Sequence, residues 1–268
     1  MWIPRVSSTP RRKSAEPMKT AIITGASSGL GREFVRQLAD VFPEIECYWL
    51  IARRRDRLEE MAKMLSREVV CFTLDLCDPM SFTTLQERLS TDRPEVELLV
   101  NNAGCGYLGR LGEMETATQT RMVDLNLRAL TAVTNLVLPF MPVGGHVLNV
   151  SSIASFCPNP RMTVYSASKA YVSAFTIGLA EEQKNRGVTA TAVCPGPMKT
   201  EFLDVGNITG NSPMFALLPY CDQVRVAGGA LRAARAGRTI YTPRLFYKAY
   251  RLLAKLTPAK LMVKFTKT

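Results

Sequence analysis

Short apolar runs alternate along this chain with longer stretches in which apolar residues return every three or four positions. The short runs have the length of buried strands, and the longer stretches have the period of amphipathic helices. Strands are predicted at about residues 19–24, 47–52, 69–74, 97–101, 145–151, 188–194 and 239–242. Helices are predicted at about residues 29–42, 55–66, 79–90, 118–140, 163–186, 222–236 and 244–256.

The predicted strands are apolar on both faces, which is typical of a parallel sheet covered by helices on each side. We therefore expect an α/β fold with a single Rossmann-type, doubly wound parallel sheet of about seven strands. With 268 residues the chain fits one such domain, which we place at residues 18–243. The polar and basic residues 1–17 are expected to be disordered, although a transit peptide or a true start at Met18 would also explain them.

The net charge of +11 comes from the two ends of the chain. Residues 223–268 hold eleven lysines and arginines and no acidic residue, and residues 1–20 carry a net charge of +4. The body between them has a net charge of −4, which argues against nucleic-acid binding by that body. The question of a charged partner is therefore confined to the ends.

The seven cysteines and the single histidine argue against disulfides and metal sites. The cysteines are odd in number, scattered and without C-x-x-C spacing, so we expect reduced thiols in a cytoplasmic protein. His146 alone cannot form a ligand cluster, and no metal site is predicted. The apolar runs are shorter than the ~18 residues that span a bilayer, so any membrane contact is expected to be peripheral.

Tyr165 and Lys169 are four residues apart in a predicted helix, so their side chains leave the same face. Ionising a free tyrosine at pH 7 costs about 4 kcal/mol. A cation about 4 Å away, at an effective dielectric of about 20, returns a similar amount. We therefore expect Lys169 to lower the pKa of Tyr165 and the pair to act in proton transfer near neutral pH.

Further motifs surround this pair in a definite order along the chain. They are Thr24-Gly25-Ala26-Ser27-Ser28-Gly29-Leu30-Gly31, Asn101-Asn102-Ala103-Gly104, Asn126, Ser152 thirteen residues before Tyr165, and Pro195-Gly196-Pro197-Met198-Lys199-Thr200. In this order the motifs resemble the short-chain dehydrogenase/reductase family over roughly residues 18–243. The resemblance implies a nicotinamide dinucleotide cofactor and hydride transfer between that cofactor and a carbonyl/alcohol pair.

The glycine-rich turn is the predicted phosphate-binding element. Glycines let the backbone approach a phosphate, and a helix N-terminus supplies N–H donors and a favourable dipole. The turn residues expected to hold the cofactor are Gly25, Ser27, Ser28, Gly29, Leu30 and Gly31. The resemblance adds Asp75 at the adenine, Asn102, Ala103 and Gly104 at the cofactor backbone, Gly196 and Thr200 at the nicotinamide carboxamide, and Pro195, Met198, Tyr165 and Lys169 as further contacts.

The end of the second strand is expected to select the cofactor. A carboxylate there would bind the 2′ hydroxyl of NAD and repel a 2′ phosphate. Here the strand ends in arginines, and Arg53 and Arg54 offer planar donors suited to phosphate, which favours NADP. The alternative is that these arginines form a solvated face paired with Asp56 or Glu59.

The resemblance also implies a role for each catalytic residue. Tyr165 would give or take the proton, and Lys169 would tune it and contact the nicotinamide ribose. Ser152 would hydrogen-bond the substrate oxygen. Asn126 would kink the long helix and hold a water in the proton relay, although a mid-helix asparagine facing solvent is an alternative. Because all four positions are filled, a non-catalytic dinucleotide-binding protein is disfavoured.

The substrate pocket is expected between residues 154–156, the loop 199–221 and Tyr107. Its predicted apolar lining is Phe156, Phe202, Met214, Phe215, Leu217 and Leu218. A medium-sized hydrophobic ketone, aldehyde or secondary alcohol fits such a lining. The alternative is that these residues only pack the loop onto the body of the protein.

Residues 244–268 are predicted to form a basic amphipathic helical extension. Lys248, Arg251 and Lys255 share one face, and Leu245, Ala249, Leu252 and Leu256 share another. Attachment to an anionic membrane surface is one interpretation, and a packing helix over the active-site side or a subunit interface is the other. The family resemblance further implies a homodimer or homotetramer formed through the helices at 163–186 and 222–236.

Overall fold

The computed structural model describes residues 5–6, 17–208, 215, 218–264 and 266. Its sheet has the strand order β1-β4-β3-β2-β5-β6-β7-β8. The strands are β1 (Arg5–Val6), β2 (Lys19–Thr24), β3 (Cys47–Ala52), β4 (Glu68–Thr73), β5 (Glu95–Asn101), β6 (His146–Val150), β7 (Thr189–Val193) and β8 (Ile240–Tyr241). Strands β2 to β8 pair in parallel, which confirms the predicted doubly wound sheet of seven parallel strands.

One strand was not predicted. Arg5 and Val6 form β1, which pairs antiparallel with Val70 and Val69 at the edge of the sheet. The predicted disordered leader, residues 1–17, otherwise lies outside the described residues except for Pro17.

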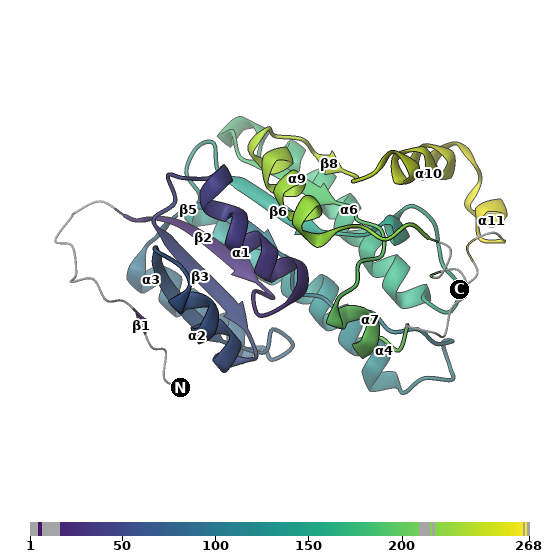
Figure 1. Cartoon of the computed structure of the whole chain (residues 1–268), viewed down its shortest axis with the longest axis horizontal. Helices are drawn as coiled ribbons and strands as arrows, with labels where there is room; N and C mark the ends of the chain where they lie inside the picture. The colour runs from purple at the N-terminus through teal and green to yellow at the C-terminus, as the bar shows by residue number, and fades with distance from the viewer. Residues whose placement is uncertain (1–4, 7–16, 209–214, 216–217, 265, 267–268) are drawn as a thin grey trace.

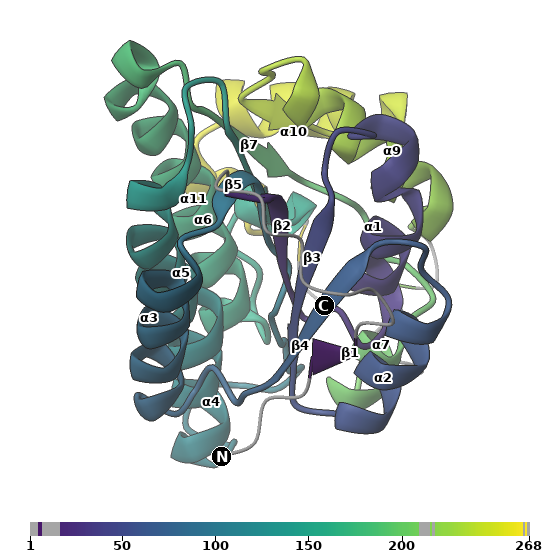
Figure 2. The same cartoon turned by 90° about the vertical axis from the view of Figure 1, so that its left-hand side faces the viewer.

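Helices cover both faces of the sheet, as Figure 2 shows. Buried side chains of α1 and α9 pack on one face in a core that also takes in Leu58 and Met61 of α2. Side chains of α3, α5 and α6 pack on the other face around Val133 and Leu179. The α-helices are α1 (Gly29–Val41), α2 (Arg55–Lys63), α3 (Met80–Asp92), α4 (Thr116–Val123), α5 (Leu130–Val137), α6 (Thr163–Glu182), α7 (Glu201–Val205), α9 (Gln223–Arg235), α10 (Leu245–Leu256) and α11 (Ala259–Met262).

The helix predicted at residues 118–140 differs from an ordinary α-helix. It consists of α4, a π-helical segment η1 (Asp124–Ala129), α5 and a 3₁₀ turn η2 (Leu138–Phe140). A π-helical segment inserts extra backbone into a turn and is frequently found at functional sites. Asn126 lies in this segment.

The strand order places a cavity at the carboxyl edge of the sheet. The chain leaves β2 toward β3 and β4 on one side, and β5, β6 and β7 extend on the other. Such a reversal opens a crevice beyond the strand ends, where ligands bind in open α/β sheets. A cavity of about 710 Å³ lies there.

None of the helices in the described ranges is long and apolar enough to cross a bilayer. The described residues also contain no group of three or more histidine, cysteine, aspartate or glutamate side chains placed to hold a metal ion.

Candidate active site

The glycine-rich turn joins β2 to α1 and forms one wall of the cavity. Gly25 has a φ of +66°, and its N–H donates to Ile51 O at 2.8 Å. A Cβ on Gly25 would lie 2.7 Å from Asn102 Nδ2, so only glycine fits in both conformation and space. Ser27, Ser28, Gly29 and Leu30 follow on the cavity wall, where the N-terminus of α1 points its N–H groups and dipole into the cavity.

Gly31 does not line the cavity, although it was predicted to contact the cofactor. A Cβ at this position would lie 2.1 Å from Gly25 O. Glycine is therefore needed here so that the first turn of α1 can pack against the backbone of the glycine-rich turn.

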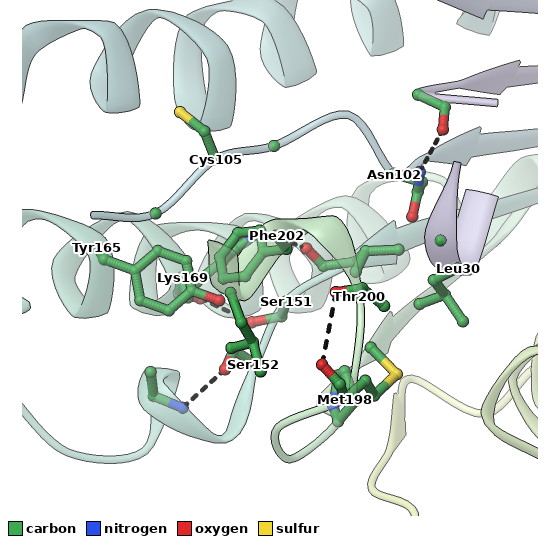
Figure 3. A pocket seen from close by; sticks show the side chains of 18 of the residues that line it. Leu30, Asn102, Cys105, Ser151, Ser152, Tyr165, Lys169, Met198, Thr200 and Phe202 are labelled. Carbon is green, nitrogen blue, oxygen red and sulfur yellow. Dashed lines mark hydrogen bonds between the residues drawn. The ribbon is translucent and has the colours of Figure 1, made fainter. Parts of the chain in front are cut away.

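Asn102 ties the ends of β2 and β5 together. Its Nδ2 donates to Thr24 O and Gly25 O, each at 3.1 Å. The Thr24 hydroxyl in turn accepts from the N–H groups of Asn102 and Ala103, each at 3.0 Å. Asn102, Ala103 and Gly104 all line the cavity, so this network fixes the glycine-rich turn against the neighbouring wall (Figure 3).

Arg53 and Arg54 lie at the end of β3 and line the cavity. Arg54 donates to Glu201 at 2.8 Å and to Ser27 Oγ at 3.3 Å. Glu201 also accepts from Arg57 at 2.5 Å, and the pKa of its carboxyl is lowered by the hydrogen bonds from Arg57 and Arg54. Glu201 was not predicted from the sequence, because it is 147 residues from Arg54.

The alternative, a pairing of Arg53 or Arg54 with Asp56 or Glu59, is not seen among the described residues. The neighbouring Arg55 instead donates to Glu59 at 2.6 Å.

Asp75 follows β4 and lines the cavity beside Arg53. Its carboxylate accepts from Cys77 N at 3.0 Å and from Arg121 at 3.1 Å. Burial alone would raise the pKa of Asp75, but these two hydrogen bonds outweigh it and hold the pKa below its usual value. Asp75 therefore stays ionised and fixed in orientation at neutral pH.

Tyr165 and Lys169 project from α6 toward Ser152, which follows β6, and all three line the cavity (Figure 3). The Ser152 hydroxyl faces Tyr165 closely enough to affect the pKa of its phenol, and it accepts from Ala154 N at 3.1 Å. Lys169 Nζ lies 5.8 Å from the centre of the Tyr165 ring and donates to Val150 O at 2.8 Å. The structure therefore brings together the predicted triad of tyrosine, lysine and serine.

The pKa values of this pair differ from the sequence-based expectation. Burial raises the pKa of Tyr165 to about 12, and the neighbouring Ser152 hydroxyl opposes this only in part. Burial also lowers the pKa of Lys169 to about 8. The predicted lowering of the tyrosine pKa is therefore not found, because loss of water dominates and the Lys169 ammonium donates to the Val150 carbonyl.

Asn126 is buried behind the cavity wall and does not line the cavity. Its Nδ2 donates to Cys105 O at 2.8 Å and to Ser168 Oγ at 3.0 Å, and its Oδ1 accepts from Cys105 N at 2.9 Å. A Cβ added to Gly104 would lie 3.1 Å from Asn126 Oδ1 and 3.4 Å from Lys169 Nζ. The alternative of a solvent-facing asparagine is wrong, since the side chain holds the backbone of residues 104–105 beside Lys169.

The segment after β7 forms the opposite wall. Pro195, Gly196, Met198 and Thr200 line the cavity. A Cβ on Gly196 would lie 2.2 Å from Cε2 of Tyr247, so the ring of α10 rests directly on this glycine.

The predicted substrate pocket is found in part. Tyr107, Ala154, Phe202, Phe215 and Leu218 line the cavity. Met214 and Leu217 lie outside the described residues.

Ser155 and Phe156 are not on the cavity wall, and Phe156 instead packs against Tyr250, with ring centres 6.1 Å apart. Sequence reasoning missed the wall residues Cys157, Met162, Phe246, Tyr247, Tyr250 and Thr266. The spacing of Tyr247 and Tyr250, three residues apart on the helix face opposite the leucines, was the signal that could have found two of them.

A protein-family model described as short chain dehydrogenase matches residues 19–207. The chain belongs to the short-chain dehydrogenase family. The resemblance inferred from the motifs is therefore confirmed, and the membership makes the chain an oxidoreductase by family.

Curated relatives of this short-chain dehydrogenase include carbonyl reductases. Sulfoacetaldehyde reductase 2 of Chromohalobacter salexigens is 36% identical over 187 residues, which cover 68% of this chain and 73% of the relative. The very-long-chain 3-oxoacyl-CoA reductase of Rattus norvegicus is 28% identical over 242 residues, which cover 85% of this chain and 76% of the relative.

Solved structures agree with the fold. A short-chain dehydrogenase from Sphingobium yanoikuyae in complex with NADPH has a TM-score of 0.75 and 26% identity, covering 90% of this chain and 96% of that chain. A family member from Burkholderia phymatum in complex with NAD has a TM-score of 0.75 and 23% identity, covering 88% of this chain and 92% of that chain. The family neighbours therefore bind nicotinamide dinucleotides of both kinds.

Proposed function

We propose that this short-chain dehydrogenase is an NADP-dependent reductase of a hydrophobic ketone or aldehyde, acting in reverse on the secondary or primary alcohol. The observation that carries the proposal is that Tyr165, Ser152 and Lys169 share one cavity with the glycine-rich turn. A hydride supplied by NADPH reaches the carbonyl carbon when the cofactor is bound. The protein orients the substrate and supplies the proton.

The cavity fits a dinucleotide in shape and chemistry. Gly25 and Gly31 stand where any Cβ would collide with neighbouring backbone or with Asn102, so the turn keeps its backbone free to approach phosphates. The cavity volume of about 710 Å³ lies in the upper part of the range for ligand sites.

NADP is proposed over NAD because cations occupy the end of β3. Arg53 and Arg54 line the cavity there, and the strand ends without a carboxylate. Among the structural neighbours both cofactors are found, so the preference rests on these two arginines. The test is a fluorescence titration with NADPH and NADH, in which tighter binding of NADH would reject the preference.

Proton transfer is assigned to Tyr165. A pKa of about 12 keeps its hydroxyl protonated at neutral pH, which suits a proton donor to a carbonyl oxygen that gains negative charge. Ser152 lines the cavity beside Tyr165 and would donate to the same oxygen. Lys169 donates to Val150 O at the end of β6, and it supplies positive charge to the site at pH values below its pKa of about 8.

A hydrophobic substrate is proposed because the cavity beyond Tyr165 is lined by aromatic and aliphatic groups, among them Phe202, Phe215 and Tyr250. Among the described wall residues, the cations are Arg53, Arg54, Arg121 and Lys169. The three arginines surround Asp75 and Glu201 at the cofactor end, so the described substrate end offers no partner for a sulfonate. The long-chain acyl substrate named for the rat relative matches this lining better than the small anionic aldehyde.

We also propose a homodimer or homotetramer assembled through α6 and α9. Exposed apolar side chains support it, namely Tyr171 and Ile177 on α6 and Val224 on α9. Sedimentation velocity would test it, and a monomer at micromolar concentration would reject it.

The central experiment compares the wild type with Tyr165→Phe in a panel of hydrophobic ketones and aldehydes, followed by loss of NADPH absorbance. The variant is expected to bind NADPH normally and to lose turnover by several orders of magnitude. Near-normal turnover of the variant would reject the mechanism. A wild type that binds NADPH but reduces none of the panel would favour the alternative of a non-catalytic dinucleotide-binding protein.

A further inference from the structure

Helix α10 presents two different faces. Tyr247 is fully buried, lines the cavity, and donates its hydroxyl to Pro219 O at 2.7 Å. Tyr250 and the more exposed Phe246 also line the cavity. One face of α10 therefore belongs to the wall of the candidate active site.

The opposite face is an apolar stripe in contact with solvent. Its members are Leu245, Leu252, Leu253 and Leu256, with exposed fractions of 80%, 60%, 55% and 75%. Leu261 of α11 is 49% exposed. Helical spacing places Leu245, Leu252 and Leu256 in one row, and Figure 1 shows α10 and α11 at the end of the molecule farthest from β1. A row of leucines in water marks a docking face.

Positive charge flanks this stripe. Lys248 and Lys255 are exposed on α10, and Arg251 lies between them on the same side of the helix. The chain from residue 244 to its end has seven lysines and arginines and no acidic residue. A second copy of the same face would bring like charges together, whereas an anionic lipid surface complements both the charge and the leucines.

We infer that α10 docks on an anionic membrane surface, with its leucine stripe in the interface and its cations at the lipid headgroups. Because Phe246 and Tyr250 lie on the same helix and line the cavity, docking brings the substrate end of the cavity to within one helix of the lipid surface. The substrate class is then a carbonyl on a lipid chain that enters from the bilayer. This last step rests on the proposed function, whereas the docking itself does not.

The binding test is co-sedimentation of the full chain with vesicles of phosphatidylcholine, alone or mixed with phosphatidylglycerol. Binding is expected on the anionic vesicles and is expected to weaken with salt, because screening shortens the reach of the cations. The double variant Lys248→Gln with Lys255→Gln should weaken partitioning by about twenty-five-fold, at about fivefold for each charge removed. Leu252→Ser and Leu256→Ser should each weaken it by about tenfold.

Two control substitutions, one for the leucines and one for the lysines, lie near the amino ends of the strands, away from α10. Val143→Ser removes an apolar side chain that is 87% exposed before β6, and Lys63→Gln removes an exposed cation at the end of α2. Both variants should partition like the wild type. Wild-type protein that stays in solution with anionic vesicles at low salt, or three α10 variants that bind as well as the controls, would overturn the inference.

A second measurement separates a lipid partner from a second copy. If Leu252→Ser and Leu256→Ser change the sedimentation coefficient while vesicle binding is absent, the stripe is a self-association face and the inference fails. The same variants should retain turnover of a short water-soluble ketone and lose most turnover of a carbonyl lipid held in anionic vesicles. Vesicle binding without turnover of either substrate would refute the proposed function and leave the docking intact.

Discussion

Glu201 and Arg54 form an ion pair, 2.8 Å between Glu201 Oε2 and Arg54 Nη1, that links the segment after β7 to the end of β3. Both residues line the cavity. Their side chains are 48% and 39% exposed, so the pair contributes little to stability by itself. Its importance lies in competition, because a 2′ phosphate placed at the end of β3 would require the same guanidinium.

Glu201→Gln is expected to strengthen NADPH binding. The substitution removes a negative charge that holds Arg54 and would repel a phosphate, and for exposed pairs the gain is about two- to fivefold in Kd. NADH has no 2′ phosphate, so its affinity should stay unchanged. Fluorescence titration with both cofactors at low and high salt measures the effect, which should shrink as salt rises.

Glu59→Gln is the matched control for this prediction, because Glu59 pairs with Arg55 on the same helix and neither residue lines the cavity. Equal changes in NADPH affinity for Glu59→Gln and Glu201→Gln would mean that only the net charge of the protein matters.

Lys169 is expected to make stability depend on pH in the alkaline range. Its pKa is about 8 in the folded chain and 10.5 as the ordinary value, so between these values the unfolded chain binds more protons. The free energy of unfolding therefore rises with pH in that window. At pH values below this window, burial of the charged ammonium destabilises the fold by roughly 3 kcal/mol. The hydrogen bond from Lys169 to Val150 O offsets part of this cost.

Lys169→Met should therefore stabilise the protein at neutral pH by roughly 1–3 kcal/mol, with an advantage that vanishes as pH approaches the ordinary lysine value. Urea unfolding of both proteins across this range measures it. Lys63→Met, at an exposed position, is the control for the loss of one positive charge. If the difference in unfolding free energy between wild type and Lys169→Met did not change with pH, the pKa of Lys169 would not be lowered by folding.

The fold and much of the cavity wall could be predicted because their signals are local. Strand positions follow from short apolar runs, and the turn that begins at Gly25 has a spacing that only a strand-to-helix junction explains. The pair Tyr165 and Lys169 follows from helical periodicity alone, and Ser152 from its place after an apolar strand. Each of these features depends on residues within about one element of each other.

The features of the site that could not be predicted depend on contacts between segments far apart in the sequence. Glu201 meets Arg54, and Tyr247 meets Gly196, through tertiary packing that leaves no periodic trace in the sequence. The direction of the Tyr165 pKa shift also required the structure, because burial decides it and burial depends on all surrounding elements.

Asn126→Ala is expected to destabilise the fold by about 2–4 kcal/mol, because it leaves both the N–H and the carbonyl of buried Cys105 without their side-chain partner. Since these bonds hold residues 104–105 beside Lys169, turnover should fall as well. Urea unfolding and NADPH oxidation measure the two effects. Ser168→Ala is the matched control: it removes one bond to Asn126 and keeps both bonds to Cys105, so it should cost about 1 kcal/mol. Equal costs for the two variants would contradict this account.

Gly196 and Tyr247 are expected to be coupled in stability. A Cβ on Gly196 would lie 2.2 Å from Cε2 and 2.4 Å from Cζ of a fully buried ring whose hydroxyl is held by Pro219 O. Gly196→Ala should therefore cost about 1–3 kcal/mol as an overpacking change. In a Tyr247→Ala background the ring is gone, and the same substitution should cost almost nothing.

Urea unfolding of Gly196→Ala, Tyr247→Ala and the double variant completes a double-mutant cycle. The expected coupling between the two positions in unfolding free energy is at least about 1 kcal/mol. Gly178→Ala is the control, because a Cβ there meets nothing within 4 Å and the residue is exposed in a middle turn of α6. Alanine at that site should stabilise the protein by up to about 1 kcal/mol through helix propensity. If Gly196→Ala lowers the free energy of unfolding equally in both backgrounds, Tyr247 does not pack on Gly196 as the structure places it. The argument that α10 connects the apolar stripe to the active site then fails.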